Sequence, residues 1–439
     1  MPAAAVFAGT RSPGFARQTE IARFQALPEG RAVDRILVTH AGSLIRPPEL
    51  LSFLAAKESG GPVDEDAYTR CLRDSVADVV RRQVDAGIDV VDDGEMGKAS
   101  WITYLYERVS GLEARPMDTR GGSILPPSRD RQAFPGAYAE LDALDEAASR
   151  QSAAAAGGTT AEQDTETGGA VSWVCTGPLR YDRTALDRDI ANLTAALADH
   201  DGTEAFLPVV APASAYWLTN EYYKDDEEFV FALADVLHEE YRAIVDSGLL
   251  LQVDDAVLMH ECDTIMSRSG SFEDYRRWAE LRVRALNHAL RGIPEERVRY
   301  HVCFGSWHGP HAFDPPLRDV VDLVLDVHAG AYAIEQANPR HEHEWRLWED
   351  VKLPDGKKLI PGVVTHHTNV VEHPELVAQR LARLANVVGR DNVIGGTDCG
   401  FAQGAFITRV HPEIQWAKLA ALAEGARLAS EQLRGARAA

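Results

Sequence analysis

A histidine and a cysteine stand two residues apart in His301-Val302-Cys303. The run closes a β-branched stretch that predicts a strand, and residues two apart in a strand project from the same face about 6.6 Å apart. One metal ion at about 2.0–2.3 Å from each donor can therefore contact both side chains. Packing of a histidine beside a cysteine is the alternative, so a metal site requires further ligands.

Two more candidate ligands follow predicted strands. Glu335 comes directly after Ala331-Tyr332-Ala333-Ile334, and Cys399 lies in Gly395-Gly396-Thr397-Asp398-Cys399-Gly400. Glycines on both sides of Cys399 allow the backbone to approach another group closely. A salt bridge, for instance to Arg340, is the alternative for Glu335, and a buried structural thiol is the alternative for Cys399.

Together the four residues make a stronger case than any one of them. His301, Cys303, Glu335 and Cys399 all fall at the C-terminal ends of predicted strands, where α/β barrels assemble their active sites. Two thiolates, an imidazole and a carboxylate suit Zn²⁺ better than Mg²⁺ or Ca²⁺. Structural zinc sites usually use close-spaced cysteine pairs, so ligands on separate strands indicate a catalytic zinc ion.

Other polar residues also end predicted strands. Glu95, Asp254 and Asp255 could bind a substrate ammonium group or accept a proton, and ion pairs with loop arginines are the alternative. His366 and His367 follow another strand, and only one of two successive side chains can face inward. The candidates for shaping the mouth of the site are Trp307, His308 and His311.

Short β-branched runs that alternate with helical patterns position these residues. The predicted strands are Ile36–Thr39, Ile88–Val91, Val171–Cys175, Phe206–Val210, Leu249–Val253, Val298–Cys303, Ala331–Ile334, Ile360–Val364 and Asn392–Ile394. The alternation predicts an α/β fold, a single-domain (β/α)8 TIM barrel, with Phe206–Val210 as the surplus strand of an insertion. No glycine-rich phosphate motif follows the first strand, which disfavours a doubly wound open sheet. The predicted helices are Asp64–Ala86, Asp225–Ser247 and Pro374–Val388.

The domain organisation follows from composition. Residues 1–34 form a polar lead-in, 35–430 the barrel and 431–439 a C-terminal tail. A stretch at about 115–169, after the second strand region, is rich in Gly, Pro, Ala and Thr. It predicts a low-complexity excursion that buries little apolar surface.

Charge and cysteine content exclude several classes. The chain of 439 residues has a formal charge of −22, which disfavours nucleic acid and an anionic membrane surface as partners. No apolar run approaches the roughly 20 residues that span a bilayer. Five cysteines without a close-spaced framework fit a reducing compartment, so a cytoplasmic location is expected.

The ordered set of motifs resembles the cobalamin-independent methionine synthase family, and most closely its short single-barrel relatives, which include epoxyalkane:coenzyme M transferases. The matching segments are Val38–Ser43, Asp93–Glu95, Cys175–Pro178, Gln252–Asp255, His301–Cys303, Ile334–Glu335, Gly362–His367 and Asp398–Gly400. The resemblance implies that zinc is held by the four candidate ligands and that His367 assists methyl transfer. It also implies a homocysteine site around His40 and Ser43, with Glu95, Asp254 and Asp255; Asp254 is in addition a candidate proton acceptor.

A zinc-dependent S-alkyltransferase is therefore the predicted function. The leading version transfers a methyl group from a folate-type donor such as methyltetrahydrofolate, or from another methyl donor, to a zinc-bound thiol such as homocysteine. Leu179-Arg180-Tyr181-Asp182 replaces the family's aromatic stretch in the folate site, which leaves open the addition of a coenzyme M-like thiol to an epoxide or other small electrophile. A zinc hydrolase is the rival enzyme class, and zinc storage is the non-enzymatic alternative.

Overall fold

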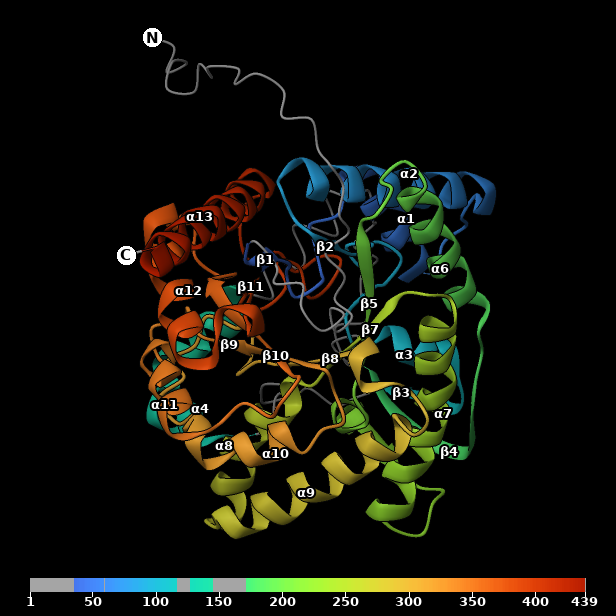
Figure 1. The fold of residues 1–439 in the computed structure, drawn as a ribbon. Coiled ribbons are helices and arrows are strands. Elements are labelled where there is room, and N and C mark those ends of the chain that lie inside the picture. The colour runs from blue at the N-terminus through green and yellow to red at the C-terminus, as the bar shows by residue number, and fades with distance from the viewer. Residues whose placement is uncertain (1–34, 59, 117–126, 145–170, 439) are drawn as a thin grey trace.

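Parallel strands form the centre of the computed structural model, which describes residues 35–58, 60–116, 127–144 and 171–438 (Figure 1). Their order is β1-β11-β10-β9-β8-β7-β5-β2. The strands are β1 (Leu37–Val38), β2 (Val90–Val91), β5 (Glu204–Val210), β7 (Leu250–Asp254), β8 (Val298–Val302), β9 (Ala331–Glu335), β10 (Lys358–Val364) and β11 (Ile394–Thr397). The Asp89 amide donates to the Val38 carbonyl (2.9 Å) and the Thr39 hydroxyl to the Val90 carbonyl (2.9 Å), which brings the two edges together. The predicted α/β barrel is confirmed.

Helices cover the outside of the barrel (Figure 1). They are α1 (Pro48–Glu58), α2 (Glu65–Asp85), α3 (Tyr104–Arg108), α4 (Arg129–Ala133), α6 (Thr184–Leu197), α7 (Asp226–Asp246), α8 (Ala256–Ser269), α9 (Phe272–Ala289), α10 (Val321–Leu325), α11 (Leu347–Asp350), α12 (Pro374–Val388) and α13 (Pro412–Ala438). The ends of α2, α7 and α12 agree with prediction because local signals set them. Asp64 and Asp225 cap α2 and α7 through their side chains, and Pro374 opens α12.

The barrel interior changes from apolar to polar toward the C-terminal ends of the strands. One apolar cluster comprises Leu37, Val90, Phe206, Leu250, Ala331, Ala333, Ile360 and Ile394. Above it lies the fully buried Arg299, which stacks on the Phe206 ring at 3.8 Å and donates to Thr39 Oγ1 and the His40 carbonyl, both at 2.9 Å. Burial lowers the pKa of Arg299 to about 9. The apolar cluster and Arg299 thus form the floor on which the residues at the strand ends are arranged.

A second sheet corrects one prediction. Strands β3 (Val109–Pro116) and β4 (Val171–Tyr181) pair antiparallel, and β6 (Leu218–Asn220) joins β4 in parallel. The predicted strand Val171–Cys175 therefore belongs to this sheet, whereas Phe206–Val210 lies in β5 of the barrel. The assignment of Phe206–Val210 to an insertion was wrong, because alternation of apolar residues identifies a strand but not the sheet it joins.

The predicted flanking segments are described only in part. The lead-in 1–34 lies outside the described residues, and so do residues 117–126 and 145–170 of the excursion. The excursion's described middle contains α4 and a further helical stretch at 135–144. The expected tail from 431 continues α13 to Ala438. Within the described parts of the chain, no helix is long and apolar enough to cross a membrane.

Candidate metal centre

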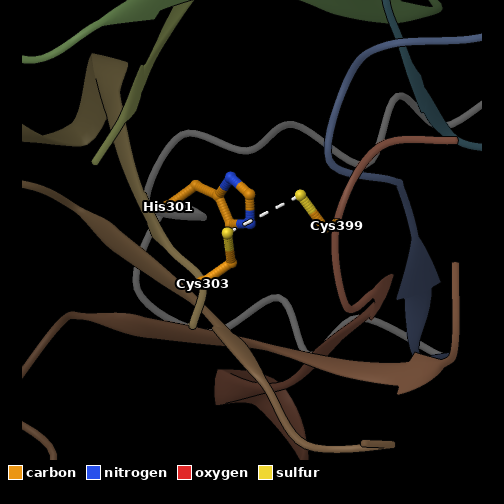
Figure 2. A group of neighbouring side chains, drawn as sticks. All are labelled: His301, Cys303 and Cys399. Carbon is orange, nitrogen blue, oxygen red and sulfur yellow. Dashed lines mark hydrogen bonds between the residues drawn. The ribbon is translucent and has the colours of Figure 1, made fainter. Parts of the chain in front are cut away.

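Three of the four predicted ligands meet at the C-terminal ends of the strands (Figure 2). His301 comes from β8, Cys303 follows that strand directly, and Cys399 lies two residues beyond β11. One ligand atom from each of the three lies within 4.8 Å of the others, and the two sulfur atoms are 3.8 Å apart. All three side chains are buried. The cluster therefore has the size and the donors of a metal site.

Glu335, the fourth predicted ligand, lies beside the cluster. It ends β9, and its Oε2 accepts the backbone N–H of Phe304 at 3.0 Å. Its Oε1 is buried and has no hydrogen-bond partner among the described residues. Glu335 groups instead with His366 and Asp398, whose ligand atoms lie within 4.8 Å of its own. Glu335 interacts electrostatically with both cysteines, and its free oxygen would supply the fourth donor that a tetrahedral zinc site needs.

The charges in the cluster favour a thiolate. Although burial opposes it, the hydrogen bond between His301 Nδ1 and Asp254 Oδ1 (2.8 Å) raises the pKa of His301 to about 9. The hydrogen bond with Cys303 lowers the pKa of Cys399 to about 6, and His301 acts in the same direction. The same hydrogen bond, together with burial, raises the pKa of Cys303. These contacts favour the thiolate form of Cys399, the form that binds a metal ion, and His301 would bind the metal as a neutral imidazole whose Nδ1–H donates to Asp254.

Sulfur, imidazole and carboxylate donors of this kind fit zinc. Soft thiolates and an imidazole favour zinc over Mg²⁺ and Ca²⁺, which prefer oxygen ligands. Burial protects the thiols from water, and the unpartnered Glu335 oxygen shows that the donor set is not satisfied within the protein alone.

Asp254 acts on the cluster through His301, and this contact makes a prediction. Gln252 Nε2 donates to Asp254 Oδ1 at 2.8 Å, so the carboxylate itself is held in place. A carboxylate on the second nitrogen of a metal-binding histidine fixes the ring orientation, and its loss costs about 10- to 100-fold in metal affinity. Asp254→Asn is expected to weaken zinc binding by that factor in a competition titration with a chromogenic chelator.

Asp255→Asn is the matched control. The Asp255 side chain contacts Ser214 Oγ, the Leu258 amide and the Tyr300 hydroxyl, and only the Asp255 backbone N–H, which the substitution leaves in place, reaches His301, at its carbonyl (2.8 Å). Because asparagine also caps helices well, this change should leave zinc affinity within about twofold. Equal affinities for the two variants would contradict the role assigned to Asp254.

Ser43 and Glu95, two of the predicted substrate-binding residues, are both buried near residues that adjoin the cluster. The Ser43 carbonyl accepts the Phe401 amide (2.8 Å), and a Cβ on Gly400 would come within 2.0 Å of Ser43 Oγ. Only glycine therefore lets the segment that follows Cys399 pack against Ser43. Glu95 adopts a left-handed backbone conformation (φ 56°), which is uncommon for a residue with a side chain and is enriched at functional sites. Burial raises the pKa of Glu95 to about 7.

Two other predicted substrate-binding residues have internal partners. His40 contacts Gln83 Oε1 through Nε2 (2.7 Å), and its Nδ1 accepts the Gly42 amide (3.2 Å). Burial lowers the pKa of His40 to about 4. Asp255 is the N-cap of α8 and binds the Tyr300 hydroxyl at 2.8 Å. In this structure both side chains form hydrogen bonds within the protein.

His366 and His367 occupy different environments. His366 is fully buried, and its Nδ1 lies 4.0 Å from Glu335 Oε1. His367, the predicted catalytic residue, is partly exposed and its ring lies 5.8 Å from that of His308. Burial lowers the pKa of His366 well below its ordinary value and that of His367 to about 4. His366 thus faces the interior and His367 the rim.

A buried lysine fixes the loop that carries these histidines. Lys418 Nζ of α13 donates to Glu372 Oε2 (2.9 Å), Thr365 Oγ1 (3.1 Å) and the Val370 carbonyl (2.6 Å). Removing one partner of a buried ion pair costs about 3–5 kcal/mol because the other charge stays desolvated. Lys418→Met is expected to lower the free energy of unfolding by about that much in urea titrations.

The double variant Lys418→Met/Glu372→Gln provides the control. It removes both charges, so at least half of the lost stability should return. A double variant as unstable as the single one would show that packing, rather than charge, dominates at this position.

Asp398 and Ser306 also contact the cluster, although neither is among the predicted site residues. Asp398 Oδ1 accepts the amides of Gln336 and Ala337 (2.9 and 2.8 Å), which holds the backbone after Glu335. Ser306 Oγ donates to Cys399 Sγ at 3.1 Å. The position of Asp398 beside Cys399 was an available signal. No sequence signal connects Ser306 with a residue 93 positions away.

A cavity of about 620 Å³ lies elsewhere, between α1, α2 and the start of α13. None of the predicted metal ligands lines it. Arginines and carboxylates line it in similar numbers, so its charge favours neither an anionic nor a cationic ligand. The candidate site is therefore defined by the buried cluster and not by this cavity.

Fold and site together define a class: an α/β barrel with a two-thiol, one-imidazole centre at the C-terminal ends of its strands. Residues 215–421 match the model of the family described as "Cobalamin-independent synthase, Catalytic domain". The chain is related to the cobalamin-independent methionine synthases, and the resemblance predicted from its sequence is confirmed.

Individual relatives agree with the family match. The methionine synthase of Thermococcus kodakarensis is 24% identical over 362 residues, which cover 82% of this chain and 84% of the relative. That of Sulfurisphaera tokodaii is 22% identical over 400 residues, covering 90% and 93%. Among solved structures, a B12-independent methionine synthase from Shewanella sp. W3-18-1 has a TM-score of 0.63 at 19% identity, with 91% and 99% covered. A putative B12-independent enzyme from Listeria monocytogenes has a TM-score of 0.60 at 19% identity, with 90% and 98% covered, and both structures share the fold.

Proposed function

We propose that the protein is a zinc-dependent S-alkyltransferase that methylates homocysteine or a similar thiol. The observation that carries the proposal is the buried cluster of Cys303, Cys399 and His301 beside an unpartnered Glu335 oxygen. The relatives that align over most of their length are named methionine synthases, which favours homocysteine as the thiol. A zinc ion held there would lower the pKa of a substrate thiol and hold its sulfur toward the alkyl donor.

The protein's own residues would bind and orient the thiol. Glu95 and Asp254 place two carboxylates near the cluster, and Ser43 lies next to the segment that follows Cys399. The carboxylates would bind the ammonium group of an amino-acid thiol, while Asp254 also keeps His301 oriented. Holding both reactants in place supplies much of the rate gain in a transfer of this kind.

The methyl donor would approach from the side of the rim histidine. In the transfer the bond between the folate N5 and the methyl carbon breaks and a sulfur–carbon bond forms. The electron pair of the broken bond stays on nitrogen, which then takes up a proton. We assign His367 to the donor side because it lies at the rim beside His308, whereas His366 is enclosed next to Glu335.

A panel of thiols crossed with donors tests the proposal by mass spectrometry. Zinc-loaded protein is expected to form methionine from homocysteine and methyltetrahydrofolate, and to lose this activity with a chelator. Reaction of a coenzyme M-like thiol with an epoxide, and none with methyl donors, would keep the alkyl-transfer class and replace its substrates. Hydrolysis of the donors in the absence of any thiol would contradict the proposal.

A further inference from the structure

The described middle of the excursion, residues 127–144, is attached to the loop that follows Cys303. Asp130 is buried, and its two carboxylate oxygens accept the backbone N–H groups of Ala312 (3.0 Å) and His311 (3.1 Å). His311 has a left-handed backbone conformation (φ 53°), which costs free energy without such support. Asp130 therefore fixes the end of the loop at 304–314.

Tyr138 extends this attachment to the centre of the same loop. Its hydroxyl donates to Asp130 Oδ2 (2.6 Å) and accepts Trp307 Nε1 (3.0 Å). The Trp307 ring stacks on that of His311 at 4.3 Å and meets the His260 ring edge-on at 5.4 Å. Trp307 is thus held by a hydrogen bond at its Nε1, by the stacked His311 ring and by a perpendicular contact with the His260 ring.

The excursion is also anchored to the barrel itself. Asp263 of α8 accepts the amides of Arg129 (3.2 Å) and Asp130 (3.1 Å), and the Arg129 side chain at 2.7 Å. These contacts tie residues 127–144 to α8, whose N-terminus follows β7. Residues 127–144 therefore form hydrogen bonds both with α8 and with the loop at 304–314.

The loop at 304–314 reaches the candidate metal centre. Ser306 Oγ donates to Cys399 Sγ (3.1 Å), and His308 Nε2 contacts the His367 carbonyl (2.9 Å). Only Trp307 separates these two residues. A shift of Trp307 would therefore move both the hydroxyl on the cluster thiol and the contact with the rim histidine.

Strand order places this loop opposite the candidate thiol site. In the closed barrel β8 lies across from β1, which precedes Ser43, while β2, which precedes Glu95, is the neighbour of β1. A thiol bound at Ser43 and Glu95 thus leaves the opposite side, at 304–314, for the second substrate, and from there His308 contacts the His367 carbonyl.

We propose that residues 127–144 set the wall of the site that faces the alkyl donor, with Asp130 and Tyr138 as positioning residues and Trp307 and His308 as the residues that determine donor specificity. This inference rests on the proposed function and extends it. It gives the excursion a role that its low-complexity composition does not suggest.

Kinetics and hydrogen exchange of three variants test this inference. Asp130→Asn replaces a carboxylate that accepts three hydrogen bonds by an amide with one oxygen, and Tyr138→Phe removes the Trp307 contact. Gln132→Ala is the matched control, because Gln132 lies in the same segment and its side chain donates to Ser267 Oγ of α8 (2.8 Å). Zinc content, KM for each substrate, and amide exchange of the 304–314 peptide are measured for each variant.

In Asp130→Asn, exchange at His311 and Ala312 should rise about tenfold, because their amides lose their acceptor. KM for the donor should rise about tenfold in both test variants, with zinc content and KM for the thiol within about twofold. The control should match the wild type. Faster exchange without a change in donor KM, or an equal rise of both KM values, would overturn the inference. A wild type that binds zinc yet alkylates no thiol would instead contradict the proposed function, and the exchange data would still report the attachment of the loop.

Discussion

Cys399→Ser is expected to lose its zinc and its transferase activity. Structural zinc sites contribute roughly 10–16 kcal/mol through four ligands, so one ligand accounts for about 2.5–4 kcal/mol, or on the order of 100-fold in affinity. After brief dialysis against a chelator, the wild type should keep about one zinc per chain by elemental analysis, and the variant less than about a tenth of that. Thiol alkylation should fall in parallel, because the transfer requires the metal.

Cys262→Ser is the matched control for this experiment. Cys262 is also a buried free thiol, but it lies in α8 outside the cluster. Its replacement should reduce stability modestly and leave zinc content unchanged. If Cys399→Ser retains zinc as tightly as Cys262→Ser does, the ligand assignment is wrong.

Glu95→Gln is expected to raise KM for the thiol substrate about 10- to 100-fold, because a hydrogen bond to a charged group contributes about 1.5–3 kcal/mol. The substrate ammonium would bind the ionised carboxylate. Since burial raises the pKa of Glu95 to about 7, wild-type kcat/KM for the thiol should fall as pH drops below 7. In the variant, kcat/KM for the thiol should not fall as pH drops below 7, and steady-state kinetics between pH 5.5 and 8.5 would show the difference.

The stability of the same variant provides an independent check. A carboxyl group whose pKa is higher in the folded than in the unfolded state binds more protons when folded, so the protein loses stability as pH rises from about 4.5 to 7. Above pH 7 this cost is fully present, and the neutral glutamine removes it. Glu95→Gln should therefore be at least as stable as the wild type at pH 8. A less stable variant would make the KM change a folding effect and contradict the binding role.

Strand periodicity was sufficient to predict that His301, Cys303 and Cys399 lie together, while their role as metal ligands stays a prediction. His301 and Cys303 share a face because they are two residues apart at the end of β8, and parallel strands bring their C-terminal ends to one side of the barrel. Cys399 follows from the same rule, although its strand lies three positions away in the sheet. Glu335 follows the same rule only in part, because its ligand atom groups with His366 and Asp398 and its second oxygen accepts the Phe304 amide.

The remaining features depend on contacts between distant segments. The wrong choice between Val171–Cys175 and Phe206–Val210 arose because both sequences predict a strand. Only the neighbouring strand with which each one forms hydrogen bonds shows whether it belongs to the barrel or to the smaller sheet. The roles of Ser306 and Asp130 depend on partners 93 and 181 or more positions away. The excursion was expected to bury little, yet Asp130 and Tyr138 are both buried against the 304–314 loop.

The proposed function requires that a substrate thiol binds a metal ion held by Cys303, Cys399 and His301. Zinc K-edge X-ray absorption of the purified protein, with and without homocysteine, tests it most directly. We expect two sulfur and two nitrogen or oxygen neighbours at about 2.0–2.3 Å, and one further sulfur when homocysteine is added. A spectrum that homocysteine leaves unchanged, or a site with no sulfur neighbours, would contradict it.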